Sequence, residues 1–347
     1  MSFFSYSVMR RGAGIYQSKK GLSASSLPNV IFTLLICAAC WYLGYYYRIG
    51  FPVRSNSGTS LLWNFVCTVL TEEKYVYIAG FSLLFLAATF IQRFNFLFVI
   101  IKGRTILPFL LFLILNSVNP DFYPIRPVSI ALFLLILSLF ELFGSYQNPT
   151  VTGRMFNIMV YIGAGSLIWP YLLWFIPIFW IGMYQFRILN TRTFLASLTG
   201  IFTIFWFVLG WCVWKHDFGV FTNIVQCLLD FRIVFANESW ITDWPTPLCF
   251  FIFMIGILFY LSLQELESSI RTRHFLSFLF LFGFFSFILS LFYASVFVDF
   301  ECIFYLSVSI IISYYFSGKY GLATYLFYYL LIALLIVLLF IHLWNFL

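Results

Sequence analysis

The sequence predicts an all-α fold, a polytopic transmembrane helical bundle of about 11 spans with interfacial amphipathic helices in its outer loops. The chain has 347 residues, of which 63% are hydrophobic and 9% charged. A soluble domain is roughly 45–50% apolar and about 25% charged. Long apolar runs also recur along the whole chain. Basic and acidic residues alternate between the segments that join these runs, as expected when a chain crosses a membrane repeatedly.

The N-terminal segment, residues 1–27, is predicted to be a basic cytoplasmic tail. It carries Arg10, Arg11, Lys19 and Lys20, and the apolar run that follows it continues without a cleavage-site pattern. Residues 28–347 are then a single integral membrane domain. With the N-terminus inside, most of the 19 basic residues fall in inner segments and most of the 12 carboxylates in outer ones. This arrangement satisfies the positive-inside rule and puts the C-terminus on the outer side of the membrane.

The expected spans are apolar segments bounded by charged or turn-forming residues. They lie near 28–47, 75–92, 105–118, 126–144, 155–169, 170–186, 193–214, 246–264, 275–297, 302–316 and 321–345. Residues 155–186 contain no charge and would reach about 48 Å as one helix, whereas the hydrocarbon core is about 30 Å thick. Pro170 removes a backbone donor and is well suited to begin a new helix. We therefore expect a helical hairpin that turns near Pro170, with Trp169 and Trp174 as interfacial anchors.

Two outer segments are long enough to contain more than a turn. Residues 59–70 are apolar but too short to span, and residues 215–245 contain apolar positions spaced as on one face of a helix. Both patterns predict helices that lie at the membrane interface.

These outer segments supply the candidate site residues. Glu72, Glu73 and Asp217 are candidate catalytic groups, because a carboxylate can act as a base toward an acceptor. Candidate ligands for an anionic substrate are Arg48, Arg54 and Arg232, because a guanidinium can grip a phosphate with two hydrogen bonds. Glu72 and Glu73 point about 100° apart on a helix, which argues against one shared site. The plainer interpretation is an ordinary solvated loop boundary, and we favour it.

Other chemistry has little support in the sequence. Its histidines and cysteines are not at metal-ligand spacing, so no metal site is expected, and no cofactor-binding motif is present. The positive charges are spread over several segments, which argues against nucleic-acid binding. Glu141 is the one carboxylate near the interior of an expected span, and it either faces a neighbouring helix or takes part in ion coupling.

Residues 90–215 resemble an uncharacterised family of polytopic bacterial inner-membrane proteins, a domain of unknown function. The resemblance lies in "QRFNFLFVIIKGRTILPFLLFLIL", "NPDFYPIRPVSIALFLLILSLFELF", "RMFNIMVYIGAGSLIWPYLLWFIPIFWIGMYQFR" and "TRTFLASLTGIFTIFWFVLGW". Arg154 and Phe156 match the family pattern, but Asn157 stands where that pattern has an acidic residue. The resemblance implies a bacterial inner-membrane location and no particular activity.

Two functions remain open at this point. The favoured one is a structural or accessory component of bacterial envelope biogenesis, without catalysis, whose partners are membrane lipids and other membrane proteins. The alternative is an enzyme or flippase that acts on a polyprenyl-phosphate-linked glycan at the outer face of the inner membrane. The alternative requires Arg and carboxylate side chains that converge at that face.

Overall fold

In this computed structural model the structure describes residues 27–46, 61–70, 72–101, 105–148, 150–232, 245–263 and 269–317. This part of the chain is helical apart from turns and one isolated bridge between Arg232 and Tyr293. The expected all-α class is therefore confirmed. The basic tail and the predicted span 321–345 lie outside the described residues.

The described helices follow one another in the order of the apolar segments. The first half of the chain contains α1 (Leu27–Tyr46), α2 (Leu61–Val69), α3 (Glu73–Phe98), α4 (Leu107–Val118), η3 (Pro120–Phe122), α5 (Pro127–Gly144) and α6 (Thr152–Ser166). The second half contains η4 (Pro170–Phe175), α7 (Ile176–Gln185), α8 (Thr191–Lys215), α9 (Gly219–Leu229), α11 (Pro245–Leu263), α12 (Ile270–Phe292), η6 (Ala294–Val296) and α13 (Phe297–Phe316).

Within the described residues, five helical segments are long and apolar enough to cross a membrane. They are Lys74–Phe98, Pro127–Gly144, Thr191–Lys215, Ile270–Phe292 and Ala294–Phe316. A membrane location is therefore plausible on length and composition. The expected number of about 11 spans is not confirmed, because α4 and several other apolar helices are shorter than a full crossing.

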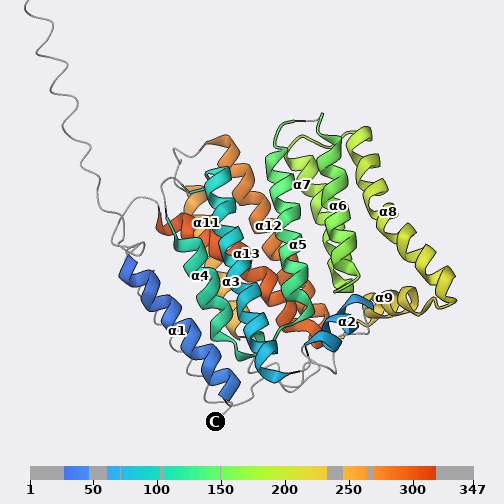
Figure 1. Cartoon of the computed structure of the whole chain (residues 1–347). Helices are drawn as coiled ribbons and strands as arrows, with labels where there is room; N and C mark the ends of the chain where they lie inside the picture. Colours follow the sequence, from blue (N-terminus) through green and yellow to red (C-terminus); the bar gives the residue numbers. More distant parts are fainter. Residues whose placement is uncertain are drawn as a thin grey trace, which may run out of the picture.

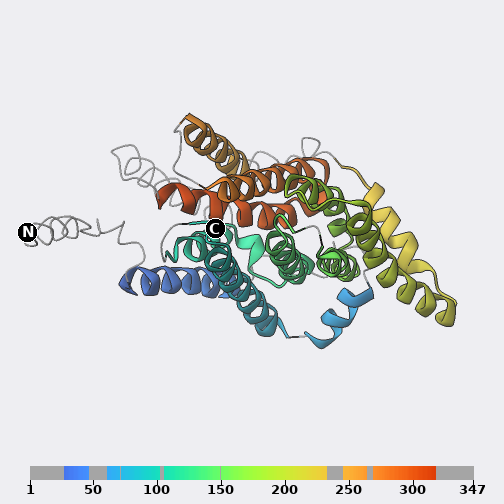
Figure 2. The same ribbon diagram turned by 90° about the horizontal axis from the view of Figure 1, so that it is seen from above.

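The bundle is centred on α13. In Figure 1, α3, α5 and α6 stand side by side, with α1 at one flank and α8 at the other. Seen from above in Figure 2, α11, α12 and α13 lie along the opposite side from α1 and α3. Of the most apolar stretch of Ala294–Phe316, 89% is buried, against 17% for the corresponding stretch of α8. Helix α13 is thus a core element, whereas α8 is attached at the periphery.

The expected hairpin at Pro170 is confirmed as local structure. Helix α6 ends at Ser166, Trp169 is extended with φ −134° and ψ 96°, and η4 begins at Pro170. Helix α7 then runs in the opposite direction to α6 and packs against α12 and α5 (Figure 1). The expectation that Trp169 is an interfacial anchor is wrong. Its indole is 2% exposed, because Tyr171 and Phe300 cover it at ring-centroid distances of 5.6 and 5.0 Å.

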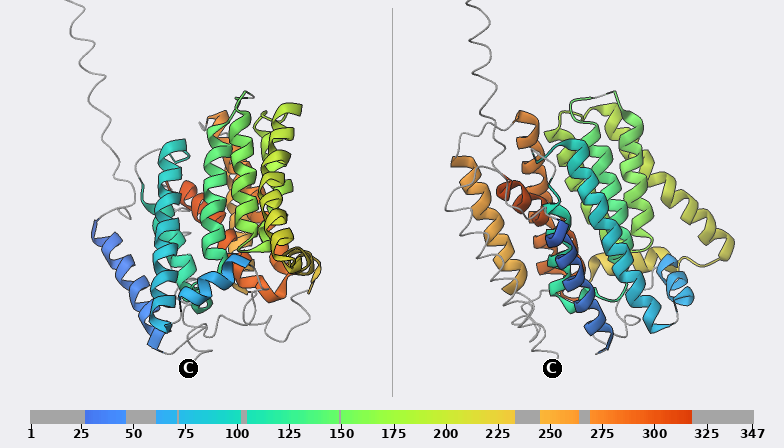
Figure 3. Two further views of the ribbon diagram at one scale, coloured as in Figure 1. Left: turned by 45° about the vertical axis from the view of Figure 1, so that its right-hand side comes forward. Right: turned by 60° about the vertical axis from the view of Figure 1, so that its left-hand side comes forward.

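Two short amphipathic helices lie across one end of the bundle, α2 and α9 (Figure 3). Helix α2 falls within the predicted segment 59–70 and buries Trp63 against Val76 and Ile125. Helix α9 occupies only the first part of the predicted segment 215–245, and residues 233–244 lie outside the described residues. These short segments are helical because the apolar face of each packs against the ends of longer helices.

The described charges separate the bundle into two ends, and we name the ends by them. The basic end, uppermost in Figure 1, contains the ends of α3, α5 and α7 and the starts of α6, α8 and α12. Its arginines are Arg93, Arg154, Arg187, Arg192, Arg271 and Arg273. The opposite, acidic end contains α2, α9 and the start of α13, and its described carboxylates include Glu72, Asp121, Asp217, Asp230, Asp299 and Glu301. This separation matches the charge alternation in the sequence.

Helix α8 is attached to α6 through glycine. A Cβ atom on Gly200 would lie 2.5 Å from the Phe156 carbonyl oxygen, and one on Gly163 would lie 3.2 Å from the Ile204 side chain. Small residues at such positions let helix backbones approach closely, which is how helices associate in lipid. The contact leaves no room for even one added methyl group at Gly200.

We predict that Gly200→Ala destabilises the protein by about 1–3 kcal/mol, because the added methyl group meets backbone that cannot move away. Gly210 lies on the same helix, and no atom lies within 4 Å of the place that a methyl group added there would take. Gly210→Ala should therefore be neutral or stabilise by up to about 1 kcal/mol, through helix propensity alone. Thermal unfolding of both purified variants in detergent checks this, and equal melting temperatures would contradict the close packing of α6 and α8.

Candidate functional site

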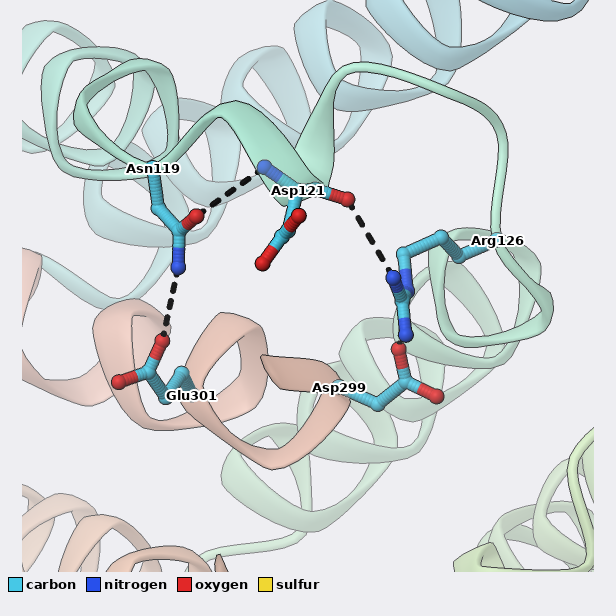
Figure 4. Close-up of polar contacts among 5 residues, drawn as sticks. All are labelled: Asn119, Asp121, Arg126, Asp299 and Glu301. Carbon is cyan, nitrogen blue, oxygen red and sulfur yellow. Dashed lines mark hydrogen bonds and ion pairs between the residues drawn. The ribbon is translucent and has the colours of Figure 1, made fainter. Parts of the chain in front are cut away.

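The loop that joins α4 to α5 folds back over the first turns of α13. Proline at 120, 124 and 127 keeps the segment "NPDFYPIRP" from continuing as a helix, since each lacks a backbone donor. The Asn119 side-chain oxygen accepts a hydrogen bond from the Asp121 backbone nitrogen at 3.0 Å. This local turn directs Asp121 and Arg126 toward α13 (Figure 4).

Five residues from this loop and from α13 form a charge cluster, in which Asp121 makes its hydrogen bonds through its backbone: Asn119, Asp121, Arg126, Asp299 and Glu301. Arg126 Nε donates to Asp299 Oδ1 at 2.5 Å, and Arg126 Nη1 donates to the Asp121 carbonyl oxygen at 3.4 Å. Asn119 Nδ2 donates to Glu301 Oε2 at 3.4 Å. Figure 4 shows that the two ends of the loop each hold one carboxylate of α13.

The ion pair between Arg126 and Asp299 is largely shielded from solvent. The Asp299 side chain is 3% exposed and that of Arg126 is 23% exposed. Burial alone would lower the pKa of the Arg126 guanidinium, but the Asp299 carboxylate outweighs this and raises the pKa overall. Asp299 also lies in the first turn of α13, where the helix dipole favours a negative charge. The fold therefore favours the charged form of the Arg126 guanidinium.

Glu301 lies deeper in the protein and is 1% exposed. Tyr305 follows one helical turn later on the same face, and its ring lies 6.2 Å from that of Phe122, the neighbour of Asp121. The Tyr305 hydroxyl is buried and has no hydrogen-bond partner within the described part of the chain. No group of three or more His, Cys, Asp or Glu side chains among the described residues could hold a metal ion. The cluster therefore offers a guanidinium and carboxylates in a packed environment.

A second connection at the acidic end joins α9 to the turn between α12 and α13. The Trp174 indole donates to the Tyr293 hydroxyl at 2.8 Å, and that hydroxyl donates to the Leu228 carbonyl oxygen at 2.6 Å. Burial raises the pKa of Tyr293, so its hydroxyl stays a donor. The backbone of Arg232 also exchanges hydrogen bonds with Phe292 and Ala294 at 3.0 and 2.9 Å. Helix α9 is thus fixed to the core at its C-terminal end.

The site residues expected from the sequence are not brought together in the described part. Glu72 pairs with Lys74 at 2.9 Å, and Arg232 pairs with Asp230 at 3.0 Å, both on exposed surface. Asp217 Oδ1 accepts from the backbone nitrogen of Gly219, the first residue of α9, at 2.8 Å. No hydrogen bond or ion pair within the described residues joins any two of these three candidates. Arg48, Arg54 and the Glu73 side chain lie outside the described residues.

Of the two roles expected for Glu141, the structure shows contact with a neighbouring helix. Its carboxylate lies 3.6 Å from Arg154 Nε, so it connects α5 to α6 at the basic end. Sequence reasoning missed the charge cluster, because its residues come from two segments that are far apart in the sequence. The one usable signal was the pattern "DFE" at 299–301, which puts two carboxylates immediately before an apolar run.

We predict that Asp299→Asn and Arg126→Gln each destabilise the protein by about 3 kcal/mol, because each leaves the partner charge buried without compensation. A double-mutant cycle of unfolding free energies in detergent should give a coupling energy well above 1 kcal/mol. Arg232→Gln is the matched control, because its Arg–Asp pair is exposed, and it should cost less than about 1 kcal/mol. Additive effects of Asp299→Asn and Arg126→Gln would show that the pair contributes nothing.

No protein-family model, no curated protein and no solved structure matches this chain. The resemblance of residues 90–215 to an uncharacterised family of bacterial membrane proteins therefore remains an expectation from the sequence.

Proposed function

We propose that this chain is a multi-pass protein of the bacterial inner membrane and a structural or accessory component of envelope biogenesis. The observation that carries this proposal is that polar groups at the acidic end bind other segments of the same chain. Arg126 engages Asp299, Asn119 engages Glu301, and Tyr293 engages α9, so these polar groups hold segments of the same chain together. Such a framework is suited to presenting a fixed surface to membrane lipids and to other membrane proteins.

The proposed topology has about 11 spans, with the basic end in the cytoplasm and the C-terminus in the periplasm. Support comes from the separation of charge between the two ends. Among the described residues, the basic end has six arginines and one carboxylate, Glu141. The acidic end has six described carboxylates outside α3 and only Lys74, Arg126, Lys215 and Arg232 as cations. Retention of basic segments on the cytoplasmic side explains this asymmetry.

We predict that reporter fusions after Lys20, Arg192 and Arg273 report a cytoplasmic location, and that a fusion after Asn237 reports a periplasmic one. A paired alkaline phosphatase and fluorescent-protein reporter makes the measurement, because each is active on one side only. An external signal after Arg192, with an internal one after Asn237, would reverse the proposed orientation of this part of the chain.

The alternative is an enzyme or flippase for a polyprenyl-phosphate-linked glycan. One observation favours it, namely that Arg126, Asp121, Asp299 and Glu301 converge at the end proposed to face the periplasm (Figure 4). These are the residue types that phosphate binding and proton transfer require. Against it, the Arg126 side chain is already paired with Asp299, and the cluster is packed. The structural role is therefore preferred.

We predict that the double variant Arg126→Met/Asp299→Val still complements a deletion strain, because a buried ion pair can often be replaced by apolar residues at little cost in stability. Envelope integrity of the strain, assayed as detergent sensitivity, is the readout, with protein level measured in the same cells. The single variant Arg126→Met is the matched control and should lower protein level. A double variant that accumulates normally yet fails to complement would show that the charges themselves are needed, in favour of the enzyme or flippase.

A further inference from the structure

Four arginines at the basic end are exposed and lie on neighbouring turns: Arg187, Arg192, Arg271 and Arg273. We call them the arginine patch. Arg187 follows α7, Arg192 lies in the first turn of α8, and Arg271 and Arg273 lie at the start of α12. Arg187 and Arg192 are thus close in the sequence, whereas Arg271 and Arg273 come from a distant segment.

Packing of α7 against α12 brings the segment of Arg187 beside that of Arg271 and Arg273, and Arg192 follows Arg187 closely in the sequence. Gln185 Nε2 donates to the His274 carbonyl oxygen at 3.4 Å. This hydrogen bond joins the segment just before Arg187 to the residue that follows Arg273. The rings of Phe186 and Phe275 lie 5.3 Å apart, and the Arg271 guanidinium lies over the Phe275 ring at 5.1 Å. Phe186 and Phe275 are fully buried. The arginine patch therefore has a rigid base.

The positive charge of the patch is not balanced locally by the described residues. The first turns of α8 and α12 contain no acidic residue, although the helix dipole favours carboxylates there and disfavours cations. The described carboxylate of the basic end, Glu141, is engaged with Arg154. Glu265 and Glu267 precede α12 in the sequence and lie outside the described residues. These two carboxylates can balance at most two of the four positive charges, so the patch keeps a net positive charge.

Exposed apolar side chains lie directly beside the arginines. Tyr184 is 74% exposed, Leu195 54% and Ile270 63%. A soluble polyanion would gain nothing from these side chains. A phospholipid has both parts that the surface fits, since its phosphate can meet the guanidinium groups while its acyl chains cover the apolar residues below.

We propose that the arginine patch binds the phosphodiester headgroup of an anionic phospholipid, with the acyl chains along the adjoining exposed faces of α7 and α8. Bidentate hydrogen bonds from guanidinium groups suit a phosphodiester better than they suit a zwitterionic headgroup, whose own cation repels the patch. The inference requires only that these helices lie in a membrane. It does not depend on the proposed role in envelope biogenesis.

The test measures lipid binding by the full chain in detergent micelles doped with phosphatidylglycerol or phosphatidylcholine, with native mass spectrometry as the readout. The wild-type protein should retain phosphatidylglycerol in preference to phosphatidylcholine. The variant Arg187→Gln/Arg192→Gln/Arg271→Gln/Arg273→Gln should lose this preference by at least tenfold, because each arginine near an anionic headgroup contributes on the order of 1 kcal/mol in binding and a tenfold change needs only about 1.4 kcal/mol.

The matched control removes the same amount of charge elsewhere: Lys74→Gln/Arg93→Gln/Lys215→Gln/Arg232→Gln. It should bind phosphatidylglycerol as the wild type does. Equal losses in the two variants would show a general effect of net charge and would overturn the site. If the patch variant does not fold, lipid binding by the wild-type protein alone tests the proposal. Equal retention of phosphatidylglycerol and phosphatidylcholine would contradict it. Binding of a short single-stranded DNA as tightly as phosphatidylglycerol would contradict it as well.

Discussion

The ion pair between Arg126 and Asp299 is the contact on which the arrangement of this bundle depends. Helix α13 is the most deeply buried of the long helices, yet it begins with two carboxylates at 299 and 301. Carboxylates at such a depth are costly unless a cation or hydrogen-bond donors meet them. The loop between α4 and α5 supplies Arg126 and Asn119 for this purpose. The loop can reach these carboxylates only if its prolines keep it from continuing as a helix. Burial of α13 therefore depends on the prolines of this loop.

Local features of the fold could be predicted from the sequence, and long-range contacts could not. The break at Pro170 follows from the length of an uncharged segment and from the missing donor of proline, which are properties of a few adjacent residues. The burial of Trp169 depends on Phe300, and the charge cluster joins residues 173 and 182 positions apart. A single sequence gives no signal for such pairings. The patterns for α2 and α9 predicted helices at an interface, but not the side on which each would meet the core.

The two ends of the bundle use their charges differently. At the acidic end, the described side chains mostly satisfy one another, through the charge cluster and through the contacts of Tyr293 with Trp174 and Leu228. At the basic end, Glu141 and Arg154 connect two helices, while other arginines remain exposed on the turns. The polar groups at the first end therefore serve internal cohesion, and those at the second are available to the surroundings. Of the candidates expected from the sequence, Glu72, Asp217 and Arg232 lie at the acidic end, where neighbouring residues satisfy them.

The position of α13 near the end of the described chain has a consequence for biosynthesis. Arg126 is synthesised 173 residues before its partner Asp299. At about 5–20 residues per second, the ribosome needs roughly 10–30 seconds to cover that distance. During this interval α4, α5 and the loop between them exist without the helix against which they pack in the finished structure, and the Arg126 guanidinium has no Asp299 to pair with, so it must stay solvated.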